Sequence, residues 1–155
     1  MADGVFNIAK GRTNEYANRV DSGDPSTARL QLKLLSTAAA DATMKDFDTF
    51  AAILAGTSVE ATFTNYGGGI TVAAADITIT TDDSGDTQYY TISDQTWTSA
   101  GGATNNTLAK LIVCYDALGT DVDANLIPLT YHDFVATTNG NDLTADFGTK
   151  VFEAS

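Results

Sequence analysis

The clearest alternation of apolar and polar residues lies in RLQLKLL, residues 29–35. Leucines occupy every second position, and the residues between them are polar: Arg29, Gln31 and Lys33. Neighbouring side chains on a strand point to opposite faces. The pattern therefore predicts a half-buried strand, with its leucine face in the core and its polar face in water.

Two stretches have apolar residues at helical spacing. Residues 5–20 predict an irregular helix, weakened by Gly11 and three asparagines, whose apolar contacts are Phe6, Ala9, Tyr16 and Val20. Residues 43–55 predict a better helix that covers one side of a sheet. Thr43 is placed to cap the amide of Asp46, and Gly56 follows the expected end of this helix.

From residue 59 onward the pattern favours strands separated by turns. Residues 59–66 alternate, 70–81 hold two short runs, and DDSGD forms a turn into a strand beginning at Gln88. LAKLIVCYD, residues 108–116, is nearly continuously apolar, as in a central strand. The run through Pro128 indicates an edge or a bend, and residues 143–154 supply a last strand or two.

These elements predict the fold class and the domain organisation. We expect a mainly β protein of the α+β type with a helical N-terminal third, built as a β-sandwich or an open barrel. Residues 1–24 would form an N-terminal segment able to act as an anchor. Residues 25–155 would form a single mainly β domain with one helix near 43–55.

The charge distribution changes this picture in one respect. The 155 residues carry 20 acidic and 8 basic side chains, a net charge of −12, which argues against binding nucleic acid through a basic surface. Five of the eight bases fall within the first 35 residues, against four acids. Two interpretations stay open: an acidic surface that keeps the protein soluble, or a near-neutral N-terminal segment that docks on a partner.

Residues that could carry chemistry are few and isolated. The only histidine, His132, is followed by Asp133, and adjacent strand positions face opposite ways, so the two cannot form an oriented pair by themselves. Cys114 lies in an apolar run and is expected to be a buried thiol. One cysteine and one histidine cannot complete a zinc site. We therefore expect no enzymatic activity and no cofactor.

Two loops deserve testing as ligand sites. Asp121, Asp123 and Asn125 have the spacing of the first ligands of a calcium loop, but the glycine and the closing glutamate are missing, so an acidic turn is the simpler interpretation. The Gly101–Gly102 pair leads into a strand, unlike a phosphate-binding loop, which opens a helix. It is expected to be a wide turn that follows a core Trp97, with Lys110 half-exposed beyond it.

Several runs together resemble small structural proteins of tailed bacteriophages: FNIAKGR and NRVDSGDP, EATFTNY, residues 94–116, and NLIPLTYHDF. The resemblance covers most of the chain and implies a virion component without enzymatic activity. The expected function is a capsid decoration (cement) protein on the capsid surface of the virion, with the major capsid protein and neighbouring copies of itself as partners. A homo-oligomer is expected, with a trimer as one option, and no nucleic acid or membrane as a partner.

The N-terminal segment is the expected contact with the capsid, through Phe6, Lys10, Arg12, Tyr16 and Arg19. Two alternatives remain open. One is a different position in the virion: a head–tail connector, a tail component or a fibre base. The other is a host- or carbohydrate-binding β module that stacks sugars on exposed Trp97, Tyr89 and Tyr90.

Overall fold

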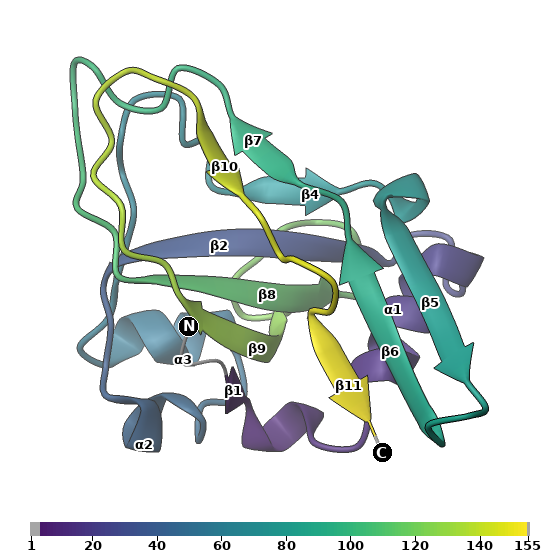
Figure 1. The fold of residues 1–155 in the computed structure, drawn as a ribbon. Helices are drawn as coiled ribbons and strands as arrows, with labels where there is room; N and C mark the ends of the chain where they lie inside the picture. Colours follow the sequence, from purple (N-terminus) through teal and green to yellow (C-terminus); the bar gives the residue numbers. More distant parts are fainter. Residues whose placement is uncertain (1–3, 155) are drawn as a thin grey trace.

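The computed structural model describes residues 4–154, and the strands in this range form three antiparallel sheets (Figure 1). The largest sheet has the order β1-β9-β8-β2-β3, and β4 pairs with β2 beside β3. Its strands are β1 (Gly4–Val5), β2 (Arg29–Thr37), β3 (Val59–Glu60), β4 (Ile70–Val72), β8 (Lys110–Asp116) and β9 (Ile127–Asp133). The predicted central strand is β8, which is buried along its whole length.

Two smaller sheets accompany the large one. The first has the order β11-β6-β5, from β5 (Ile77–Asp82), β6 (Thr87–Ile92) and β11 (Phe152–Ala154). The second pairs β7 (Gln95–Trp97) with β10 (Leu143–Ala145). The predicted turn at DDSGD joins β5 to β6, where the Asp82 carboxylate accepts bonds from the amides of Ser84 and Gly85.

The helices are shorter than the sequence predicts. The stretch 5–20 divides into η1 (Asn7–Ala9) and α1 (Thr13–Ser22). Its first residue, Val5, belongs to β1, which pairs with β9. The predicted helix 43–55 is two pieces, α2 (Asp41–Met44) and α3 (Phe50–Ala55). Thr49 has an extended backbone and its hydroxyl accepts from the amide of Ala52, so Thr49, and not Thr43, provides the cap. A further 3-10 turn is η2 (Ala74–Asp76).

The mainly β prediction is confirmed, whereas a helical N-terminal third is not supported. Strands hold 35% of the residues and helices 17%, and the longest strand, nine-residue β2, lies between α1 and α2. The alternating leucines explain why residues 29–37 form a strand, because an extended chain buries three of these leucines on one face. The described strands do not close into a barrel.

Both faces of the large sheet are covered. One face carries Leu30, Leu32 and Leu34 of β2 and packs against buried residues of β5, β6, β7 and β10. The opposite face packs against α2 and α3 through Leu35, Ile112 and Ile53, among others. We call these the leucine face and the helix face. The predicted solvent exposure of the polar side of β2 is wrong, because Gln31 and Lys33 are each only 3% exposed on the helix face.

Later strands also differ from their sequence patterns. Residues 61–66 are not a strand, since Asn65 adopts a positive φ of 70° and turns the chain. Pro128 does not break β9, which runs through it; the register with β8 shifts between Thr130 and Pro128. β9 is not an edge strand, because it pairs with β8 and β1.

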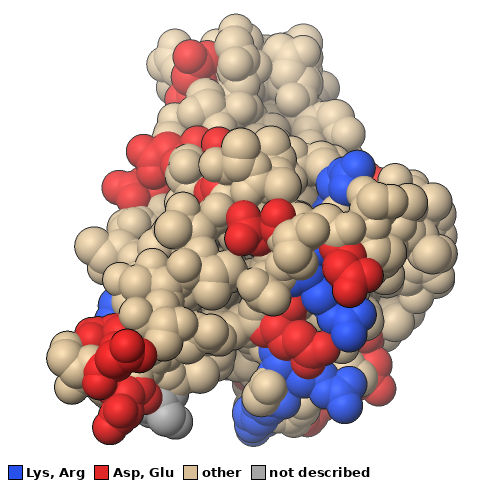
Figure 2. All heavy atoms as spheres, turned by 90° about the vertical axis from the view of Figure 1, so that its right-hand side faces the viewer, with Lys and Arg blue, Asp and Glu red and all other residues tan. Residues whose placement is uncertain are grey.

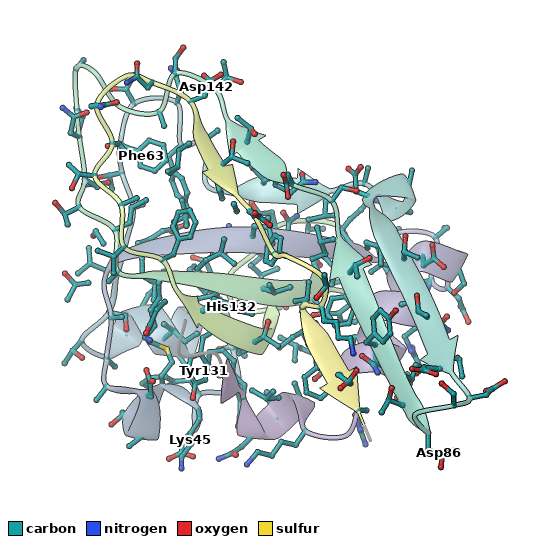
Figure 3. The ribbon with its side chains drawn as sticks, in the orientation of Figure 1. Lys45, Phe63, Asp86, Tyr131, His132 and Asp142 are labelled. Atoms are coloured by element: carbon teal, nitrogen blue, oxygen red, sulfur yellow. The ribbon has the colours of Figure 1, made fainter. Side chains whose placement is uncertain are left out.

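Three loops distant in the sequence meet at the upper left of Figure 1, in residues 61–66, 98–107 and 137–142. The amide of Thr64 donates to the carbonyl of Thr104, and that of Gly101 to the carbonyl of Thr64. The amide of Gly140 donates to the carbonyl of Ala100 at 2.7 Å. Asp142, labelled at this end in Figure 3, accepts from the amide of Ser99. We call this group the loop apex; it contains the expected wide turn after Trp97.

Candidate functional site

The structure divides the five predicted contact residues between the surface and the core. All three cations are exposed: Lys10 and Arg12 in the turn between η1 and α1, and Arg19 on α1. Phe6 is fully buried on the helix face, with its ring edge-on to that of Tyr131 at 5.2 Å. Tyr16 is half-buried and stacks on Tyr115 at 4.5 Å. Only the three cations are therefore available to a partner, together with part of Tyr16.

The exposed cations lie on α1 and near its two ends. We define the cationic face as Lys10, Arg12 and Arg19, with Arg29 beyond the C-terminal end of α1. In Figure 2, Lys and Arg side chains gather at the lower right with some acidic groups between them, whereas Asp and Glu cluster at the lower left. Arg19 is paired on the surface with Glu15 at 3.0 Å, and that pair raises the pKa of Arg19.

A second charged group lies on the helix face around Lys33. Its Nζ is 2.7 Å from the Asp121 carboxylate and 2.7 Å from the carbonyl oxygen of Gly68. Carboxylates of Glu60 and Asp123 lie at 3.9 and 4.0 Å. The Phe50 ring is 5.6 Å from the same nitrogen. Four segments thus converge on one buried ammonium, and we call this group the Lys33 cluster.

The Lys33 cluster shows what the two aspartates with calcium-loop spacing, Asp121 and Asp123, bind in this structure. Asp121 and Asp123 do converge, but on the ammonium of Lys33, which supplies the positive charge that a calcium ion would bring. Asn125 is exposed, and its amide donates to the carbonyl of Val122. Within residues 4–154 no three His, Cys, Asp or Glu side chains are placed to hold a metal ion. The acidic-turn interpretation fits this arrangement.

Glu60 is the most buried carboxylate of the cluster, with a side chain 24% exposed. Burial raises the pKa of Glu60 above its ordinary value, partly offset by a hydrogen bond from the Tyr66 hydroxyl at 2.9 Å. Tyr66 in turn accepts from the amide of Leu34 at 3.0 Å, which fixes its position against β2. Burial also raises the pKa of the Tyr66 hydroxyl. Glu60 is therefore held in place and favours its protonated form more than a surface carboxyl does.

Lys110 forms a matching group at the other end of β8, and its expected half-exposure is wrong. It is 7% exposed, 2.5 Å from Asp133 and 2.8 Å from Asp41. The Tyr131 ring is 5.4 Å from its Nζ. Burial by itself lowers the pKa of Lys110, but the two carboxylates outweigh it and raise the pKa above the ordinary value.

His132 faces away from this group. The register places His132 opposite Leu111 on the leucine face and Asp133 opposite Lys110 on the helix face, so the two do point to opposite sides. His132 is 5% exposed, and its Nε2 lies 2.9 Å from the Thr130 hydroxyl. Its ring is edge-on to Phe147, and it lines a cavity near the centre of the view in Figure 3.

The structure does not form the sugar-stacking surface considered above. Trp97 is 3% exposed and Tyr90 is fully buried, so neither ring is open to a ligand. Tyr89 is half-buried under Lys150, whose Nζ lies 4.5 Å from the ring centre. The expected core position of Trp97 and the buried state of Cys114 are confirmed. Burial raises the pKa of the Cys114 thiol.

Sequence reasoning missed both lysine clusters. Lys33 was expected in water and Lys110 half-exposed, because lysine is rarely buried without a partner. One signal was available: the acidic residues 121 and 123 follow β8, which is the neighbour of β2 in the sheet. No sequence pattern identifies Glu60 as the third carboxylate, because it reaches Lys33 through the packing of β3 on β2.

Comparisons with known proteins identify no relative: no family model, no curated protein and no solved structure matches the chain. Of the helices that the structure describes, none is both long and apolar enough to cross a membrane.

Proposed function

We propose that this protein is a structural component of a tailed-bacteriophage virion, most specifically a capsid decoration protein that binds the major capsid protein on the head surface. One observation carries the proposal together with the resemblance in sequence: the exposed cations of the first 35 residues lie along α1 and its ends, on a protein of net charge −12. Such a charge difference gives a protein one preferred orientation on an acidic partner surface.

In this proposal the cationic face contacts the capsid and the acidic remainder faces water. Lys10, Arg12 and Arg19 make the polar contacts, and the exposed edge of Tyr16 adds apolar area. The three sheets are those of an irregular sandwich, whose role is to hold α1 rigidly. α1 is fixed by Ala17 and Val20 in the core and by a bond from Asn14 to the carbonyl of Gln88.

The test is binding to shells assembled from the major capsid protein of the same genome, measured by co-sedimentation. The double substitution Arg12→Glu with Arg19→Glu is expected to weaken binding at least about tenfold, since charge reversal places like charges together. Lys150→Glu reverses one exposed charge outside the cationic face and should leave binding within about twofold. Equal binding by all three proteins would contradict the assigned contact face.

A deletion of residues 1–24 is not a usable test, because it removes Phe6, Ala17 and Val20 from the core. The position on the particle is tested separately by mass spectrometry of separated heads and tails. Hundreds of copies on heads are expected of a decoration protein. Recovery with tails alone would instead favour a connector, tail or fibre-base component and would contradict the proposal.

A further inference from the structure

The Lys33 cluster brings together an amine, a carboxyl group (Asp121) and a second, more shielded carboxyl group (Glu60, 24% exposed), with Asp123 at 4.0 Å. The amine and carboxyl are in contact, at 2.7 Å between Nζ of Lys33 and Oδ1 of Asp121. The second carboxyl, Glu60, lies 3.9 Å from the same nitrogen. Groups held at contact distance react as if at very high concentration, up to about 10⁵–10⁸ M in well-oriented cases.

We infer that Lys33 and Asp121 condense to an intramolecular amide bond, with Glu60 as the group that carries protons between them. The bond would join the middle of β2 to the turn after β8, as a covalent cross-link within one chain. The inference does not depend on the proposed function, since it concerns the isolated chain.

The surroundings hold the reacting groups in place. The amide of Asp121 donates to the Asp116 carboxylate at 2.7 Å, which anchors the turn. The carbonyl of Gly68 accepts from Lys33 at 2.7 Å and directs the nitrogen. Gly69 permits this approach: a Cβ there would lie 2.4 Å from the carbonyl oxygen of Leu32. The loop therefore closes over the lysine without room for a larger residue.

Exclusion of water favours the reaction in the same place. Lys33 is 3% exposed, and Phe50 covers its nitrogen. A dry site destabilises separated charges relative to a neutral amine and a neutral acid. Asp121 keeps 40% of its side chain exposed, so the water that is released has a path out.

The step balances without any further reactant. The ammonium of Lys33 gives a proton to Asp121, and the neutral nitrogen attacks the Cγ atom of the protonated carboxyl group. Glu60 takes a second proton from the nitrogen and returns it to the departing hydroxyl group. The C–N bond forms, the Cγ–O bond breaks, and one water molecule leaves. The raised pKa of Glu60, caused by its burial, suits it to exchange a proton in this way.

Lys110 provides the comparison inside the same protein. It is also buried and also contacts a carboxylate, Asp133, at 2.5 Å. Its two carboxylates, Asp41 and Asp133, are 46% and 41% exposed, whereas Glu60 is 24% exposed. Both lysines thus have an acceptor at contact distance, but only Lys33 has a shielded second carboxyl group. The inference assigns the bond to Lys33 and not to Lys110.

The test is the intact mass of the purified full-length chain, denatured before measurement. The mass is expected to be lower than that of the sequence by one water molecule. Protease digestion should then yield a branched peptide that joins Lys33 to Asp121. A full, unmodified mass would overturn the inference, and so would a loss of water located elsewhere, for example in a succinimide at Asp3–Gly4.

Five variants complete the test. Lys33→Arg and Asp121→Ala are expected to retain the full mass, and Glu60→Gln should reduce the cross-linked fraction severalfold. Lys110→Arg should keep the loss of water. Asp121→Asn should still react, with the loss of one ammonia molecule instead. If Glu60→Gln cross-linked as completely as the unaltered chain, the role given to Glu60 would be wrong.

Discussion

The two faces of the large sheet are buried to a similar degree but by different chemistry. On the leucine face, β2 and β8 contribute apolar side chains, and the smaller sheets cover them. On the helix face, the same strands contribute Lys33 and Lys110 beside Leu35, Ile112 and Cys114. A single strand therefore serves both a dry apolar core and a core with paired charges.

This difference indicates which face supplies stability and which face fixes the positions of the loops. Apolar packing on the leucine face is non-directional and tolerates exchange of residues of similar volume. The lysines of the helix face need carboxylates at particular positions, because a buried charge without a partner costs several kcal/mol, about 3–5 when one partner of a buried pair is removed. The leucine face should thus supply most of the stability, and the helix face should fix which loops lie against the sheet.

The largest effect is expected from Leu32→Ala on the leucine face. Leu32 is fully buried, and its truncation leaves a cavity, so the free energy of unfolding should fall by about 2–5 kcal/mol. The measurement is urea unfolding followed by Trp97 fluorescence. A loss below about 1 kcal/mol, typical of a surface substitution, would show that this face is not the main core.

A smaller effect is expected from Lys110→Met on the helix face. Methionine keeps the apolar stem, but Asp41 and Asp133 lose their cation, and both are partly solvated. The free energy of unfolding should fall by about 1–3 kcal/mol. Lys150→Met, at an exposed lysine, is the matched control, with a change within about 0.5 kcal/mol. If both variants lost the same free energy of unfolding, the pairing of Lys110 with Asp41 and Asp133 would add no stability of its own.

The pH dependence of the Lys110 contribution sharpens the same point. The pKa of Lys110 is raised in the folded protein, so its stabilisation is complete below the ordinary lysine pKa of about 10.4. It is lost as the pH rises through the raised value. The difference in stability between the unaltered chain and Lys110→Met should therefore shrink in strongly alkaline solution. A stability difference that grows with pH would contradict the conclusion that charged Lys110 stabilises the fold.

The smallest change is expected at Cys114, which lies on the helix face of β8 opposite Gln31. The thiol is fully buried, and burial raises its pKa, so little of the reactive thiolate is present. A thiol reagent should label Cys114 in urea but not in buffer. Rapid labelling of the folded protein would show that the helix face opens far more readily than the leucine face.

The sequence predicted those elements whose pattern follows from burial on one side. The leucine alternation located β2, and the apolar run located β8. The sequence did not predict those elements whose bounds or burial depend on contacts between distant parts of the chain. The sequence placed the cap at Thr43, which lies inside α2, whereas Thr49 caps α3. The second face of β2 is covered by helices whose position the strand pattern does not contain.

The candidate site was predictable only in its exposed part. Lys10, Arg12 and Arg19 lie on the surface as expected, because charged side chains are mostly exposed. Phe6 could not be placed from the sequence, since its burial depends on the pairing of β1 with the distant strand β9. The same holds for Glu60, whose contact with Lys33 crosses from β3 to β2.

The loop apex has a consequence for the motions of the protein. Its hydrogen bonds join loops that are roughly 30–40 residues apart in the chain, as between Thr64 and Thr104 or between Ala100 and Gly140. The loop 98–107 is bonded to both of the others, so neither 61–66 nor 137–142 can move away without breaking its bonds to that central loop. The apex should therefore open as one cooperative unit, with similar hydrogen-exchange rates at the amides of all three loops.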